Sequence, residues 1–181
     1  ILLETVMHFV VRCLERLALG MNWLAALAAV LMSLFVFLGV VMRYLVGSPF
    51  MFSDEFVGLL FVSMAFLSMP LGLAMRRHII LDIVTREMGG PLRYVVDIAA
   101  TLIMTTFAVW FMVLSYDFAA FAKLLDARSD VGAMLLWPWM ALLPACTAVI
   151  VLISIAQVFD NLRQLAGKPS LFLVSSMEEV S

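Results

Sequence analysis

The histidine and aspartate of the segment HIILD are the pair in this sequence best suited to chemistry. His78 and Asp82 stand four positions apart, so on a helix they would share one face and could act as a base with its orienting carboxylate or as two metal ligands. Either site needs a third group, and the second histidine, His8, lies on a distant segment. A solvated i,i+4 pair on a helix surface is the simpler interpretation. We therefore predict no catalytic, substrate-binding or metal site.

The rest of the sequence shows no motif for binding a cofactor or for nucleophilic catalysis. A haem held by two histidines would need both inside a helical bundle, facing each other, and neither histidine is placed there. Cys13 and Cys146 form no CxxC motif, and no glycine-rich phosphate loop or nucleophile motif occurs. We expect a protein without cofactors and without enzymatic activity.

Composition places the chain in a lipid bilayer. Of its 181 residues, 65% are hydrophobic and 13% are charged. A soluble fold with this balance would expose large apolar patches and aggregate. The formal net charge of -2 gives no reason to expect nucleic acid as a partner. Membrane lipid is the expected surrounding.

Four segments lack charged residues and histidine for long enough to cross the hydrocarbon core, which takes about 20 residues. Each must be helical, because a single segment in lipid can satisfy its backbone only within itself. We therefore predict an all-α membrane protein with four transmembrane helices, and kinks or helix ends at Pro70, Pro138 and Pro144. The predicted spans are residues 17–42, 56–75, 98–116 and 131–159.

Basic residues predict the orientation of these spans. With the N-terminus inside, the cytoplasmic segments hold eight Lys and Arg residues and the outer segments hold three. This bias predicts that both termini are cytoplasmic. Half of the inner charge comes from the loop between the second and third spans, so its arginines are interpreted as topology determinants. They are Arg76, Arg77, Arg86 and Arg93.

The segments that flank the four spans have patterns of their own. Polar residues recur every four positions from Glu4 to Arg16, with apolar residues between them, which is typical of an amphipathic helix lying in the membrane interface. The C-terminal segment mixes Pro, Ser and Glu and is expected to be flexible. The predicted organisation is an interfacial helix, a four-helix transmembrane domain and a tail, at residues 1–16, 17–165 and 166–181.

Charged residues also mark the outer ends of the first two spans. Arg43 closes the first span, and Asp54 and Glu55 open the second. These charges suit the helix dipoles, which is one explanation. A pair between Arg43 and Glu55 across the short connecting loop is the other, because either charge alone at membrane depth would cost about 2.5 to 3.5 kcal/mol. The interiors of all four spans lack the polar groups of a transport site, and this indicates a scaffold.

Two stretches of this sequence resemble a known family. RYLVGSPFMFSDEF, followed after one span by RRHIILDIVTREM, is similar to the small membrane subunit of tripartite ATP-independent periplasmic (TRAP) transporters, the DctQ-like family. The resemblance in layout covers residues 17–165. The chain departs from the family pattern in having Phe52 where tryptophan is usual and LSMPLGLAM at the end of the second span. The residues that match the family motifs are Arg43, Tyr44, Phe52, Asp54, Glu55, His78, Ile79 and Asp82.

The resemblance implies a role for those residues and a set of partners. It implies a scaffold subunit in the inner membrane of a bacterium or archaeon, with the matching residues as structural or partner contacts. A large multi-span subunit would carry sodium and substrate, and an extracytoplasmic binding protein would deliver an organic anion such as a carboxylate. An orphan four-span regulator or assembly factor without a transport role is the alternative, because it would share the same composition.

Overall fold

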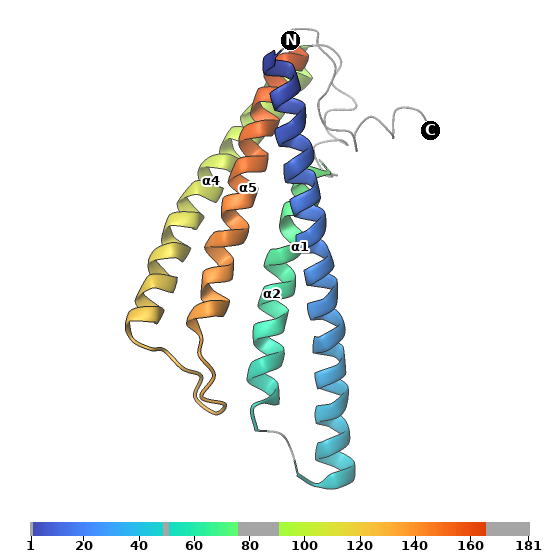
Figure 1. Ribbon diagram of the computed structural model, residues 1–181, viewed down its shortest axis with the longest axis vertical. Coiled ribbons are helices and arrows are strands. Elements are labelled where there is room, and N and C mark those ends of the chain that lie inside the picture. The colour runs from blue at the N-terminus through green and yellow to red at the C-terminus, as the bar shows by residue number, and fades with distance from the viewer. Residues whose placement is uncertain (1, 49–50, 76–90, 166–181) are drawn as a thin grey trace.

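The computed structural model describes residues 2–48, 51–75 and 91–165, and nearly all of them lie in long helices (Figure 1). Four of these helices are long and apolar enough to cross a membrane, which confirms the predicted all-α fold with four transmembrane helices. Which end faces the cytoplasm remains a prediction. The elements are α1 (Leu2–Val41), continued by the π-helix η1 (Met42–Val46), then α2 (Ser53–Ala74), α4 (Pro91–Leu124) and α5 (Trp137–Leu165).

The helices run alternately up and down, so the bundle has two distinct ends (Figure 1). We call the end where α1 begins and α5 ends the terminal end. At the opposite end, η1 leads into α2, and α4 is joined to α5 by residues 125–136. We call this second end the hairpin end. The predicted orientation would place the terminal end in the cytoplasm.

Helix α5 lies at the centre of the packing. α1 packs along α2 and α4 packs along α5, while α5 also contacts α2 and α1. The buried core toward the terminal end combines branched aliphatic residues with three alanines, which allow close approach of helices in lipid, where packing rather than hydrophobicity holds them together. It is built from Leu14 and Ala18 of α1, Leu73 and Ala74 of α2, Ala108 of α4, and Ile150, Val151 and Ile153 of α5.

The N-terminal stretch, predicted as an amphipathic interfacial helix over residues 1–16, is helical and continues without a break into the first span. It forms the first turns of a continuous α1, because no glycine or proline interrupts residues 2–19. From Val11 on, its apolar side is buried in the bundle together with Leu14 and Ala18. At 1.5 Å per residue α1 is about 60 Å long, roughly twice the hydrocarbon thickness, so part of it extends beyond the core. Contact of this part with the cytoplasmic leaflet remains a prediction.

Two other helix boundaries differ from the predicted spans. α5 begins at Trp137, because residues 131–136 belong to a loop in which Ala133 has a φ of 48°. Pro138 stands in the first turn of α5, where the missing N–H breaks no helical bond. α4 continues past the charged Asp117 to Leu124, since nothing in that sequence breaks a helix. α2 and α5 run through Pro70 and Pro144, so neither proline ends its helix.

Replacing Ile153 by alanine should destabilise the bundle. The Ile153 side chain is fully buried in the core, so Ile153→Ala leaves a cavity, which typically costs about 2 to 5 kcal/mol. The free energy of unfolding in detergent micelles measures the effect. Ile155 lies on the same helix but is 41% exposed, so Ile155→Ala is the matched control and should cost less than about 1 kcal/mol. Equal losses for the two variants would contradict this packing.

Candidate functional site: polar contacts that join α2 to the α4–α5 hairpin

The loop between α4 and α5 folds back on itself as a narrow turn. The Leu136 N–H donates to the Ala127 carbonyl at 3.0 Å, and the Ser129 N–H donates to the Met134 carbonyl at 2.9 Å. The Ser129 hydroxyl in return accepts from the Met134 N–H at 3.1 Å. These bonds leave the N–H groups at the tip of the loop, residues 130–133, for partners outside the turn.

Glu55, in the first turn of α2, binds the tip of this loop. Its Oε1 accepts from the Val131 N–H at 2.9 Å, and its Oε2 accepts from the Gly132 N–H at 2.8 Å. Hydrogen bonds to a carboxylate are stronger than those between neutral groups, and two on adjacent amides also fix the orientation. We call this pair of bonds the Glu55 clamp. It joins α2 to the connection between α4 and α5 at the hairpin end.

Gly132 is the residue that makes this approach possible. A Cβ atom at this position would lie 3.0 Å from the Phe52 Cβ and 3.1 Å from Glu55 Oε2. The first distance is shorter than side chains normally tolerate against an atom so close to the backbone. Phe52 immediately precedes α2 and forms one wall of the contact. A larger residue at 132 would push the loop off Glu55.

The predicted pair between Arg43 and Glu55 is wrong in this structure. In the described part of the chain Arg43 forms no ion pair with Glu55; it is exposed in the last turn of η1, and both Glu55 oxygens bond the loop instead. Arg43 near a helix C-terminus and Asp54 in the first turn of α2 fit the alternative explanation, dipole matching. Tyr44 is also exposed, so this corner presents free polar and aromatic groups.

An aromatic contact lies one residue beyond the clamp. The ring of Phe56 meets Phe35 of α1 edge to face at 4.7 Å and Trp139 of α5 at 6.0 Å. Aromatic pairs in this geometry stabilise beyond the area they bury. Nearby, the Lys123 Nζ lies 5.2 Å above the ring of Trp137, which ties the end of α4 to the start of α5. All four helices are thus fastened together at the hairpin end.

The remaining predicted residues lie in the connection between α2 and α4 or at the start of α4. His78, Asp82, Arg76, Arg77 and Arg86 lie outside the described residues. Arg93 lies in the first turn of α4, but its side chain is likewise outside the described part. Their roles in partner contact and topology therefore remain predictions.

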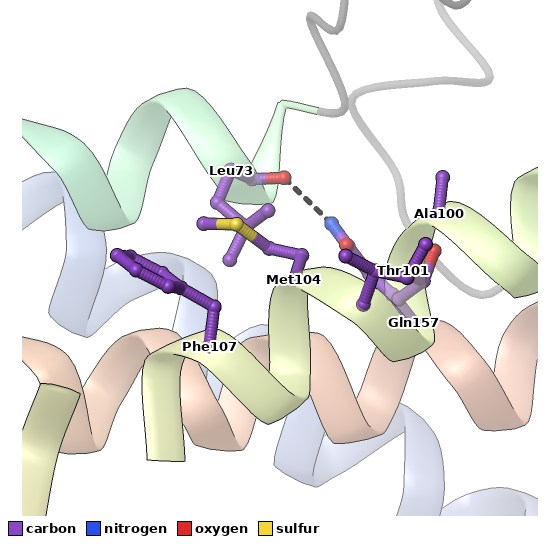
Figure 2. A pocket seen from close by; sticks show the side chains of 7 residues that line it. Leu73, Ala100, Thr101, Met104, Phe107 and Gln157 are labelled. Atoms are coloured by element: carbon purple, nitrogen blue, oxygen red, sulfur yellow. Dashed lines mark hydrogen bonds between the residues drawn. The ribbon is translucent and has the colours of Figure 1, made fainter. Parts of the chain in front are cut away.

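A second polar contact joins the same helices at the terminal end. The Gln157 Nε2 of α5 donates to the Leu73 carbonyl, in the last turn of α2, at 2.6 Å (Figure 2). Carbonyls in the last turn of a helix lack an intrahelical partner, so this buried amide supplies one. The Asn161 Nδ2 reaches the Thr101 hydroxyl of α4 at 3.4 Å, a weaker contact.

These buried polar residues were missed in the sequence. The fourth span was predicted to end at Phe159 from the absence of charged residues. That criterion takes no account of amides and hydroxyls. The signal was present as spacing: Ser154, Gln157 and Asn161 recur at three and four positions, the period of one helix face, and all three are buried. Asp160, also fully buried, adjoins this face.

A cavity of about 480 Å³ opens beside Gln157, between α2, α4 and α5 (Figure 2). Its walls are apolar apart from Gln157 and Thr101, with Met104 and Phe107 on the α4 side. A carboxylate or phosphate ligand in such a place would need a cation or several N–H donors, and no charged side chain lines this cavity among the described residues. The described walls of this cavity therefore lack the chemistry of an anion site.

A comparison with protein families identifies the family to which this pattern of spans and motifs belongs. The model of the family described as "Tripartite ATP-independent periplasmic transporters, DctQ component" matches residues 32–164. The chain belongs to the DctQ family. The match takes in η1, the Glu55 clamp, the α4–α5 loop and Gln157. Neither the search among curated proteins nor that among solved structures found a match.

Membership of the DctQ family settles the general class of this protein. It is a transporter component and not an enzyme, and it is a multi-pass protein of the inner membrane. As one component of a tripartite system, it associates with a large membrane subunit and a binding protein.

Removing the charge of Glu55 should release the α4–α5 loop. In Glu55→Gln the side chain keeps only one acceptor oxygen and gains an NH2 group, so the Val131 and Gly132 N–H groups are not both satisfied. We expect hydrogen exchange in peptides covering residues 130–133 to speed up roughly tenfold, in line with the loss of a charge-assisted bond. Asp54→Asn, on the adjacent exposed residue, is the matched control and should leave exchange unchanged.

Gly132→Ala tests the same clamp by sterics alone. The added methyl group meets Phe52 and Glu55, so exchange in the loop should rise although the Glu55 charge and both N–H donors remain. Protection retained in both Glu55→Gln and Gly132→Ala would show that the loop is held by other contacts.

Proposed function

We propose that this chain is the scaffold subunit of a sodium-coupled TRAP transporter that imports an organic anion, with a carboxylate as the expected class of substrate. An extracytoplasmic binding protein delivers the anion, and the large membrane subunit carries the sodium and substrate sites. The observation that carries this proposal is the match to the DctQ family over most of the chain.

The distribution of polar groups supports the scaffold role. Sodium sites need several oxygen ligands and carboxylate sites need cations or converging N–H donors, commonly at broken helices near the midplane. The central turns of the four helices carry mainly aliphatic and aromatic residues, with isolated hydroxyls and the amide of Asn22 in α1. Several of these hydroxyls donate to carbonyls of their own helix, such as Ser63 to Leu59 and Thr105 to Thr101. They are thus used within the chain.

The hairpin end has the features expected of a partner contact. In the proposed orientation it faces the periplasm, and Arg43, Tyr44, Phe52 and Asp54 are exposed there on a corner that the Glu55 clamp holds in place. On the cytoplasmic side, His78 and Asp82 are the proposed contacts. Sequence motifs of the family fall at both places.

Co-purification with the large subunit tests the proposal. An affinity-tagged chain, co-expressed with the large subunit and the binding protein, should recover the large subunit in near-equal amount from detergent. Arg43→Ala should weaken this recovery, because it removes an exposed charge at the proposed contact, while the melting temperature of the isolated chain stays the same.

The alternative role, as an orphan regulator, makes the opposite prediction. It expects no large subunit in the purified material and no effect of Arg43→Ala. Asp126→Asn is a suitable control, because Asp126 is also exposed at the hairpin end and lies outside the proposed contact. Loss of the partner in the control as well as in Arg43→Ala would point to general damage.

A further inference from the structure

Asp117 is an exposed carboxylate inside a helix that crosses the membrane. It lies seven residues before Leu124, the end of α4, which is about 10 Å at 1.5 Å per residue. The end of α4 is level with the start of α5, since Lys123 lies over the ring of Trp137. Tryptophan and lysine typically mark the boundary of the hydrocarbon. Measured from that boundary, Asp117 lies two helical turns deep.

Neither lipid nor water suits this part of α4. With the boundary at Lys123, Asp117 is a charge exposed to hydrocarbon, which is unfavourable and rare without a partner. With the boundary at Asp117 itself, Phe118 and Phe121, each 58% exposed, would face water. For either position of the boundary, a protein surface with a cation and apolar side chains would neutralise Asp117 and cover the phenylalanines.

Asp117 also points away from the rest of the chain. Two residues correspond to 200° around a helix, so Asp117 lies opposite Ser115, which is buried together with Ala119 and Ala122 in the face of α4 that packs on α5. In Figure 1, α4 forms the outer edge of the bundle. The outward stripe through Asp117 is large and apolar. Its members are Trp110, Leu114 and Phe121, which with Asp117 we call the α4 face.

We propose that the α4 face is the docking surface for the large membrane subunit, and that Asp117 pairs there with an arginine or lysine on one of that subunit's transmembrane helices. This inference rests on the proposed function, which supplies the partner. Charge favours this occupant over a second copy of the chain, because a two-fold contact centred on Asp117 would bring two carboxylates together. Acyl chains cannot neutralise the charge at all.

Photocrosslinking in the assembled transporter tests where the partner lies. p-Benzoylphenylalanine replaces Trp110 or Phe121 in the chain co-expressed with the large subunit, and the membranes are irradiated. We expect an adduct of this chain with the large subunit from both positions. The adduct should disappear when Asp117→Lys is combined with the label and persist with Asp117→Glu, which keeps the charge.

Asp117→Leu separates a partner contact from exposure to lipid. In the isolated chain it removes a charge from an apolar surface, so the melting temperature should stay the same or rise. In the complex it removes one member of a buried charge pair, so recovery of the large subunit should fall at least about tenfold. Asp126→Asn is the matched control, since Asp126 is exposed beyond the end of α4 and its φ of 47° suits asparagine. It should leave recovery unchanged.

The other outcomes each overturn the inference. A crosslinked dimer of this chain would assign the α4 face to a second copy. Undiminished recovery with Asp117→Leu, without an adduct, would assign it to lipid and leave the proposed function standing. Absence of the large subunit from the unaltered chain would overturn both.

Discussion

The hydrocarbon core of a membrane offers no hydrogen-bond partner, and the arrangement of this protein follows from that constraint. Backbone groups are satisfied within long helices, and several hydroxyls inside the spans bond back to their own helix, as Thr147 does to the Leu143 carbonyl. In the part of the chain that the structure describes, the stronger polar contacts between segments lie at the two ends of the bundle. Between them the helices meet through alanines and branched residues, where close packing is the available source of attraction.

Helix α2 shows how these contacts hold the two halves together. At the hairpin end Glu55 binds the α4–α5 loop, and at the terminal end the Leu73 carbonyl accepts from Gln157 of α5. The aromatic ring of Phe56 adds a contact to α1 and α5 beside the first of these. α2 is thus attached at both ends to the α4–α5 hairpin. The outer surface of α4 faces away from the bundle. A scaffold subunit needs these two properties, internal attachment and a free outer surface.

Much of this fold could be predicted from the sequence, because span number depends on charge-free length alone. The DctQ resemblance was also available from two short motifs, and the family comparison confirmed it. The partner of Glu55 was not predictable. Its ligands lie some 76 residues away and depend on a loop in which Ala133 takes a positive φ, so proximity in sequence pointed wrongly to Arg43. Gln157 was missed because an amide carries no charge. The third span was predicted to end before Asp117 because that residue is charged, whereas α4 continues to Leu124.

The central claim is that this chain supports transport without carrying it. The central turns of its helices hold no Asp, Glu, Lys, Arg or His, and Asp117, the acid nearest to them on α4, faces outward, away from the other helices. Uptake of a radiolabelled carboxylate into liposomes under an inward sodium gradient tests the claim most directly. The chain alone should give no uptake above empty liposomes, and adding the large subunit and the binding protein should establish it. Sodium-driven uptake by the chain alone would contradict the account.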